Sequence, residues 1–186
     1  MKNLLIIIFF LLGLSQKVNS QTYSSLISDA EIQKILFCEI DNIKSNFRDK
    51  FSSHKIKSEI INWKKIAYNK ETAFELLKNI IESDKQDTLK NVSDSFIDSD
   101  IEYLQQQFEN QVGEKWEIKQ TKIKFAKNPH KEFCSLSIPL FDKNHETAII
   151  YKEEIYNSIS ACATLEVYIK YGNEWKYYKS IILWVV

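Results

Sequence analysis

The chain has 186 residues, with 25 basic and 25 acidic side chains and only three glycines. This neutral balance lacks the basic patch typical of nucleic-acid-binding proteins, so nucleic acid is not expected as a partner. Only Gly113 and Gly172 follow residue 20, which excludes the glycine-rich loops that hold phosphates or dinucleotides. The G-x-S-x-G turn of serine hydrolases is absent as well.

Residues 1–20 have the layout of a secretory signal peptide. A short positive start at Lys2 precedes an apolar run over Leu4–Leu14 and a polar stretch. The run is shorter than the roughly 20 apolar residues that a membrane-spanning helix needs. We therefore expect cleavage before Gln21, export to the periplasm or beyond, and a soluble product without a stable membrane span.

The remaining 166 residues are enough for one domain with its own core, and we predict a single α+β domain over residues 21–186. Its first half has helical periodicity. Ser28 and Glu31 form a capping box at the start of the first helix. Behind it, apolar side chains recur on one helical face: Ile32, Ile35, Leu36, Ile40 and Ile43.

Two more helices are predicted further along. One covers Glu71 to Ser83, with four apolar side chains facing inward: Phe74, Leu77, Ile80 and Ile81. The other opens at a second capping box, Ser99 to Glu102, and ends before Gly113; its apolar face is Ile101, Leu104 and Phe108. The segment 56–68 fits either a strand or a helix, and residues 84–98 are predicted to form a loop.

From Trp116 onward the apolar period changes to two, which is typical of strands. Strands are expected over 116–125, 133–138, 147–151, 161–171 and 174–186, with a turn over Asp142–His145. We predict an antiparallel meander of four or five strands, with the amphipathic helices packed on one face. The apolar run 181–186 suits an interior strand, because an exposed edge of that kind invites aggregation.

Gly172-Asn173 is a two-residue hairpin signal. It predicts that Glu166 lies opposite Lys179 and that Tyr168 lies opposite Tyr177. An NTF2-like cone, in which helices close a curved sheet, is one architecture compatible with the whole pattern. It would place a pocket between Trp63, the third helix and the tyrosine-rich strands.

Three cysteines are present, and an oxidising compartment favours disulfides. Cys38 lies within the first helix and is expected to behave as a small core side chain. Cys134 and Cys162 fall on predicted strands and are the candidates for a disulfide; the alternative is three free thiols. No basic residue is placed beside any of the three, so a thiolate nucleophile is not expected.

Two patterns suggest metals without completing a site. His130, Glu132 and Cys134 alternate as one half of a metal site, but no second cluster of ligands accompanies them. The acidic run of Asp98, Asp100 and Glu102 has the spacing of a calcium loop but lacks its required glycine. We therefore expect no metal and no cofactor.

Two groups of segments carry a resemblance to other proteins. One is residues 95–107 with Lys115-Trp116, and the other is residues 137–142 and 147–151 with Cys162 and Leu183-Trp184. Together they resemble small exported proteins of unknown function from Bacteroidota-type bacteria, over roughly residues 95–186. The resemblance implies export and no mechanism. Such proteins often carry a second cysteine four positions before the one matching Cys162; Ser158 stands there, so that local disulfide cannot form.

These observations favour an exported, non-enzymatic module that binds a small ligand or an envelope or secreted protein. One alternative is a small hydrolase of envelope polymers, using carboxylates that the sequence does not identify. Another is an inhibitor or immunity-type protein with an exposed aromatic patch. A cleft with two acids of shifted pKa would favour the enzyme, a pocket the ligand binder, and a flat apolar patch the protein partner.

Overall fold

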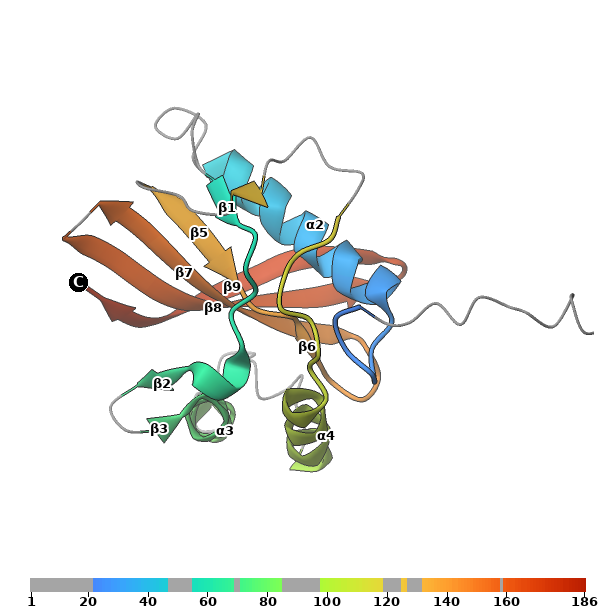
Figure 1. Cartoon of the computed structure of the whole chain (residues 1–186). Coiled ribbons are helices and arrows are strands. Elements are labelled where there is room, and N and C mark those ends of the chain that lie inside the picture. The colour runs from blue at the N-terminus through green and yellow to red at the C-terminus, as the bar shows by residue number, and fades with distance from the viewer. Residues whose placement is uncertain are drawn as a thin grey trace, which may run out of the picture.

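The computed structural model describes residues 22–46, 55–68, 71–84, 98–118, 125–126, 132–157 and 159–186. Its helices are α2 (Asp29–Asn46), the 3-10 helix η1 (Trp63–Lys65), α3 (Ala73–Asp84) and α4 (Asp98–Glu109). The main sheet contains β1 (Lys55–Lys57), β4 (Phe125–Ala126), β5 (Phe133–Leu136), β6 (Leu140–Phe141), β7 (Thr147–Asn157), β8 (Ser160–Tyr171) and β9 (Glu174–Val185). A separate ribbon pairs β2 (Ala67–Tyr68) with β3 (Glu71–Thr72). The mixed helix and sheet content agrees with the predicted α+β class (Figure 1).

The main sheet has the order β4-β1-β5-β7-β8-β9, with β6 also paired to β7. Strands β5, β7, β8 and β9 are antiparallel neighbours, as the predicted meander requires. Strand β1 is different, because it lies between β4 and β5 and runs parallel to both. The segment that fitted either a strand or a helix thus supplies β1, η1 and β2.

The helices cover both faces of the sheet, so the prediction that they pack on one face is wrong. Successive strand residues point to opposite faces. Ala148 and Ile150 of β7 pack in one core with α2, whereas Ile149 and Tyr151 pack in another with η1, α3 and α4. The sheet therefore forms the middle layer, with α2 on one side and the other helices on the opposite side (Figure 1).

Helix α2 forms as its sequence predicts. The Ser28 side-chain oxygen accepts a hydrogen bond from the Glu31 amide at 3.3 Å, and the helix begins at the next residue, Asp29. All five apolar residues of the predicted face are buried. Helix α4 likewise buries Leu104 and Phe108, although it begins one residue before the predicted cap.

Helix α3 starts two residues later than predicted, because Glu71 and Thr72 pair with β2 instead. Leu77 and Ile81 face the core as expected. In the region of the first predicted strand, Trp116 is buried but only Phe125 and Ala126 pair as a strand. Residues 85–97 of the predicted loop and 119–124 of that strand lie outside the described residues.

The β8–β9 hairpin has the predicted two-residue turn, with Tyr171 paired to Glu174. Gly172 has a φ of 61°, a conformation that glycine adopts without strain. Tyr168 lies opposite Tyr177 as predicted. An irregularity at the following position then shifts the register, so that Glu166 lies opposite Ser180 rather than Lys179.

Strand β9 is an edge strand, which corrects the expectation of an interior one. Among the described strands it pairs only with β8. Ile182 and Val185 near its end are 68% and 67% exposed. Within the described residues, no helix is both long and apolar enough to cross a membrane.

Candidate functional site

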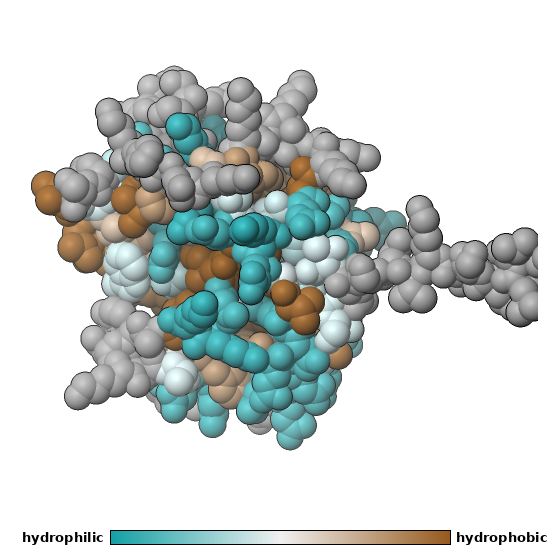
Figure 2. All heavy atoms as spheres, in the orientation of Figure 1, coloured by the Kyte–Doolittle hydropathy of each residue, from teal (hydrophilic) through white to brown (hydrophobic). Residues whose placement is uncertain are grey.

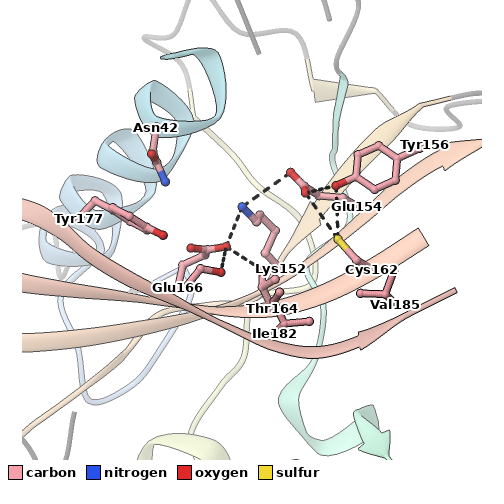
Figure 3. Close-up of a pocket in the computed structure, with 11 residues that line it drawn as sticks. Asn42, Lys152, Glu154, Tyr156, Cys162, Thr164, Glu166, Tyr177, Ile182 and Val185 are labelled. Carbon is pink, nitrogen blue, oxygen red and sulfur yellow. Dashed lines mark hydrogen bonds and ion pairs between the residues drawn. The ribbon is translucent and has the colours of Figure 1, made fainter. Parts of the chain in front are cut away.

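A cavity of about 340 Å³ lies on the α2 face of the sheet, beside the edge strand (Figure 3). Asn42 reaches it from α2, Lys152 and Glu154 from β7, and Glu166 from β8. Tyr177 and the later residues of β9 form its outer side. Helix α2 and three consecutive strands that are distant from it in the sequence therefore build one site.

The register of β7 and β8 explains why polar side chains gather here. Lys152 lies opposite Thr164, and Glu154 lies opposite Cys162. Side chains of paired residues share a face of the sheet, and so do residues two apart along one strand. Lys152, Glu154, Thr164 and Glu166 accordingly all point to the α2 side.

Lys152 is the centre of the site. Its ammonium nitrogen lies 2.7 Å from Glu166 Oε1, 3.3 Å from Glu39 Oε1 and 3.7 Å from Glu154 Oε1. The side chain is only 9% exposed. Burial lowers the pKa of Lys152, but the three carboxylates raise it more, so the net pKa lies well above its usual range and the side chain stays charged.

In both Glu166 and Glu154, the two carboxylate oxygens differ in the contacts that they make. Glu166 Oε1 accepts hydrogen bonds from Thr164 at 2.7 Å and Ser180 at 3.1 Å, in addition to its ion pair with Lys152. No described residue donates to Glu166 Oε2. Glu154 Oε2 accepts from the Tyr156 hydroxyl at 2.8 Å, whereas its buried Oε1 accepts no hydrogen bond within the described part of the chain.

Glu39 is the innermost acid of the cluster and is fully buried. It lies on the apolar face of α2, where the Tyr168 hydroxyl donates a hydrogen bond to its Oε2. Burial raises the pKa of Glu39 to about 7, even though the charge of Lys152 acts in the opposite direction. Glu39 therefore titrates near neutral pH while the lysine stays protonated.

Cys134 and Cys162, the candidates for a disulfide, are free thiols in the structure, and so is Cys38. Cys134 on β5 and Cys162 on β8 both lie opposite Glu154, so β7 runs between them. Two strand spacings amount to about 10 Å, and a disulfide needs Cα atoms within about 7 Å. Burial also raises the pKa of both thiols, which disfavours a nucleophilic role.

Other residues singled out in the sequence have structural surroundings. The Cys38 thiol contacts the Trp175 carbonyl oxygen at 3.6 Å. Asp100 is buried and accepts a hydrogen bond from the Lys143 amide at 3.0 Å, which ties α4 to the turn before β7. His130 lies outside the described residues, and within the described ranges no three His, Cys, Asp or Glu side chains come together as metal ligands.

A second cavity of about 290 Å³ lies on the opposite side of the sheet. Trp63, Phe74 and Phe108 line it, with the Trp63 and Phe108 rings 5.3 Å apart. This partly matches the pocket expected between Trp63 and the third helix. Helix α3, rather than the strand tyrosines, supplies the remaining aromatic wall.

The sequence reasoning did not identify the Lys152 cluster, although two signals were present. Glu39 interrupts the otherwise apolar face of the first helix, three positions after Leu36 and four before Ile43. Lys152 and Glu154 are two apart on one strand, and Thr164 and Glu166 are two apart on the next. Only the register shows that these pairs meet, because strand pairing depends on contacts distant in the chain.

No family model, curated protein or solved structure matches the chain. Function is therefore inferred from the geometry of the site.

Removing the charge of Lys152 should destabilise the fold strongly. We expect Lys152→Met to lower the free energy of unfolding by about 3–5 kcal/mol, because three buried carboxylates lose their cation. Urea unfolding at pH 7 measures this change. Lys44→Met is the matched control, since Lys44 forms an exposed pair with Asp41 and should cost less than about 1 kcal/mol. Equal effects of the two substitutions would contradict the central role of Lys152.

Stability should fall as the pH rises through the titration of Glu39. Its pKa of about 7 in the folded protein exceeds the usual value of 4.5, so between these values the folded state binds more protons than the unfolded state. The difference corresponds to about 3 kcal/mol lost between pH 4.5 and pH 8. We expect Glu39→Gln to lack this loss and Asp41→Asn, on the exposed side of α2, to retain it. Unfolding curves across this pH range measure it, and parallel profiles for wild type and Glu39→Gln would refute the assignment.

Proposed function

We propose that the protein is an exported, non-enzymatic module that binds a small ligand in the cavity beside Lys152. What carries this proposal is the charged wall of the cavity, where Glu166 Oε2 has no hydrogen-bond donor among the described residues. Ligand sites combine a concave surface with a few fixed polar groups, and the volume of about 340 Å³ suits a small molecule. Burying the charges of Lys152 and its carboxylates costs free energy of folding. A ligand-binding role explains why the protein retains them.

The contacts favour binding over hydrolysis. A general acid needs a raised pKa and access to the substrate. Glu39 has the raised pKa but does not line the cavity, and the carboxylates that do line it, Glu154 and Glu166, have the Lys152 ammonium between them. An enzyme that acts on envelope polymers is accordingly the weaker proposal.

A protein partner has a specific observation in its favour. Exposed aliphatic side chains gather at the end of the sheet near the β7–β8 turn, where Figure 2 shows hydrophobic surface. These side chains are Ile159, Ile182, Val185 and Val186. Ile182 and Val185 also line the cavity. We assign these two to the ligand, which leaves too small an apolar patch for a stable protein interface.

We also propose a finer fold class and a relationship to other exported proteins. An NTF2-like arrangement is supported by a cavity that lies between a helix and an antiparallel sheet. A relationship with small exported proteins of Bacteroidota-type bacteria is supported by the sequence segments described above. Ligand binding in the cavity requires neither.

Export predicts a processed N-terminus. We expect the protein isolated from its native host to begin at Gln21, because the apolar run and the polar stretch after it match a signal peptidase substrate. Intact mass spectrometry of the native protein measures the start. A mass that includes residues 1–20, or recovery of the protein in the cytosolic fraction, would contradict export.

Ligand binding predicts that filling the cavity mouth blocks small molecules. We expect a fragment set that contains cations, neutral molecules and anions to include at least one that shifts the backbone amide signals of residues 162–166 in NMR spectra. Ile182→Trp should weaken that binding at least tenfold, since residue 182 lines the cavity. Val186→Trp is the matched control, because Val186 is exposed and does not line the cavity. The proposal fails if no fragment of any charge binds here, or if both tryptophan variants bind alike.

A further inference from the structure

Among the described residues, the charges around the cavity do not balance. One ammonium group, on Lys152, faces the carboxylates of Glu39, Glu154 and Glu166. With Glu39 protonated, one cation still stands against two acids on the cavity wall. The excess negative charge would repel a negatively charged ligand, and the lysine is already surrounded by carboxylates. A positively charged ligand would instead reduce the excess negative charge.

Glu166 offers the contact that such a cation needs. Lys152, Thr164 and Ser180 all bind its Oε1. In Figure 3 the other carboxylate oxygen has no dashed contact and lies toward Tyr177. A carboxylate oxygen accepts hydrogen bonds only, so its partner must be a donor, and an ammonium group donates more strongly than a hydroxyl.

Asn42, Thr164 and Ser180 add polar groups to the cavity wall, whereas its rim on β9 is apolar or aromatic. Ile182 and Val185 expose most of their side chains at its rim. Tyr177 adds a ring that is 42% exposed. Exposed aliphatic groups beside the charged side chains of the cavity match a ligand that has one charged end and one apolar end. Binding of such a ligand removes apolar surface from water. The ring of Tyr177 also attracts cations.

We infer that the ligand is a small free primary amine joined to an apolar group. Its ammonium donates to Glu166 Oε2 beside Tyr177, and its apolar group lies over Ile182 and Val185. This inference rests on the proposed ligand-binding function and adds the chemical class of the ligand. The volume of about 340 Å³ limits that ligand to the size of an aryl-alkyl amine.

A series with one carbon skeleton tests the class on the unaltered protein. The probes are 3-phenylpropylamine, 3-phenylpropan-1-ol, 3-phenylpropanoate and the N-acetylated amine, titrated in NMR experiments. We expect the amine to bind with a dissociation constant on the order of 0.1–1 mM, as its size allows. The alcohol and the N-acetylated amine should bind at least tenfold more weakly, and the carboxylate should not bind measurably. Propylamine, which lacks the ring, should also bind more weakly.

Variants and salt locate the contact. Glu166→Gln should weaken amine binding at least tenfold and leave the weak binding of the alcohol unchanged, while higher salt should weaken the amine alone. If Glu166→Gln does not fold, the wild-type series and its salt dependence still decide the class. A lysine tripeptide blocked at both ends tests the source of the amine: tighter binding of the peptide than of the free amine would overturn the assignment to a small molecule.

The two proposals fail in different ways. If the alcohol or the carboxylate binds in the cavity as tightly as the amine, the amine class is wrong and the cavity remains a ligand site. If neutral or anionic fragments bind in the cavity but amines do not, the amine class is likewise wrong. If nothing binds, the proposed function itself fails.

Discussion

The buried ammonium of Lys152 is the constraint on which the α2 side of the molecule depends. Removing such a group from water costs several kcal/mol unless carboxylates surround it at close range. Glu39 comes from α2, Glu154 from β7 and Glu166 from β8, so the three acids tie the helix to two strands. Unlike apolar packing, this arrangement has little tolerance for sliding, because a displacement of one residue would leave a buried charge without its partner.

The irregularity of β9 belongs to the same arrangement. With a regular hairpin, Lys179 would lie opposite Glu166 and bring a second cation to the cavity. The shift after Tyr177 turns Lys179 toward the other face, opposite Val167, and places Ser180 opposite Glu166. Ser180 then donates a hydrogen bond to the carboxylate at 3.1 Å without adding charge. The bulge therefore helps to keep the cavity negative, and bulges commonly re-aim side chains beside functional sites.

Local patterns predicted much of the local structure and little of its assembly. The helical periodicity behind Ser28 and the hairpin signal at Gly172 each depend on neighbours within a few residues, and both predictions agree with the structure. The parallel pairing of β1 and the edge position of β9 depend on contacts across the chain, which periodicity does not encode. For the same reason two cysteines on strands looked suited to a disulfide, although β7 separates them.

The site lies where the cover of the sheet ends. Toward one end of β7 and β8, Ala148, Ile150 and Tyr168 are buried in the core that α2 covers. Two residues beyond Ile150 the same face becomes polar at Lys152, opposite Thr164. Helix α2 reaches this boundary with Asn42 near its C-terminal end. Beyond it Leu136 and Cys134 of β5 continue the apolar core beside Lys152 and Glu154, whereas β8 and the edge strand β9 carry Thr164, Glu166 and exposed side chains. The change from apolar to charged residues along β7 and β8 therefore opens the cavity on the β9 side of these strands.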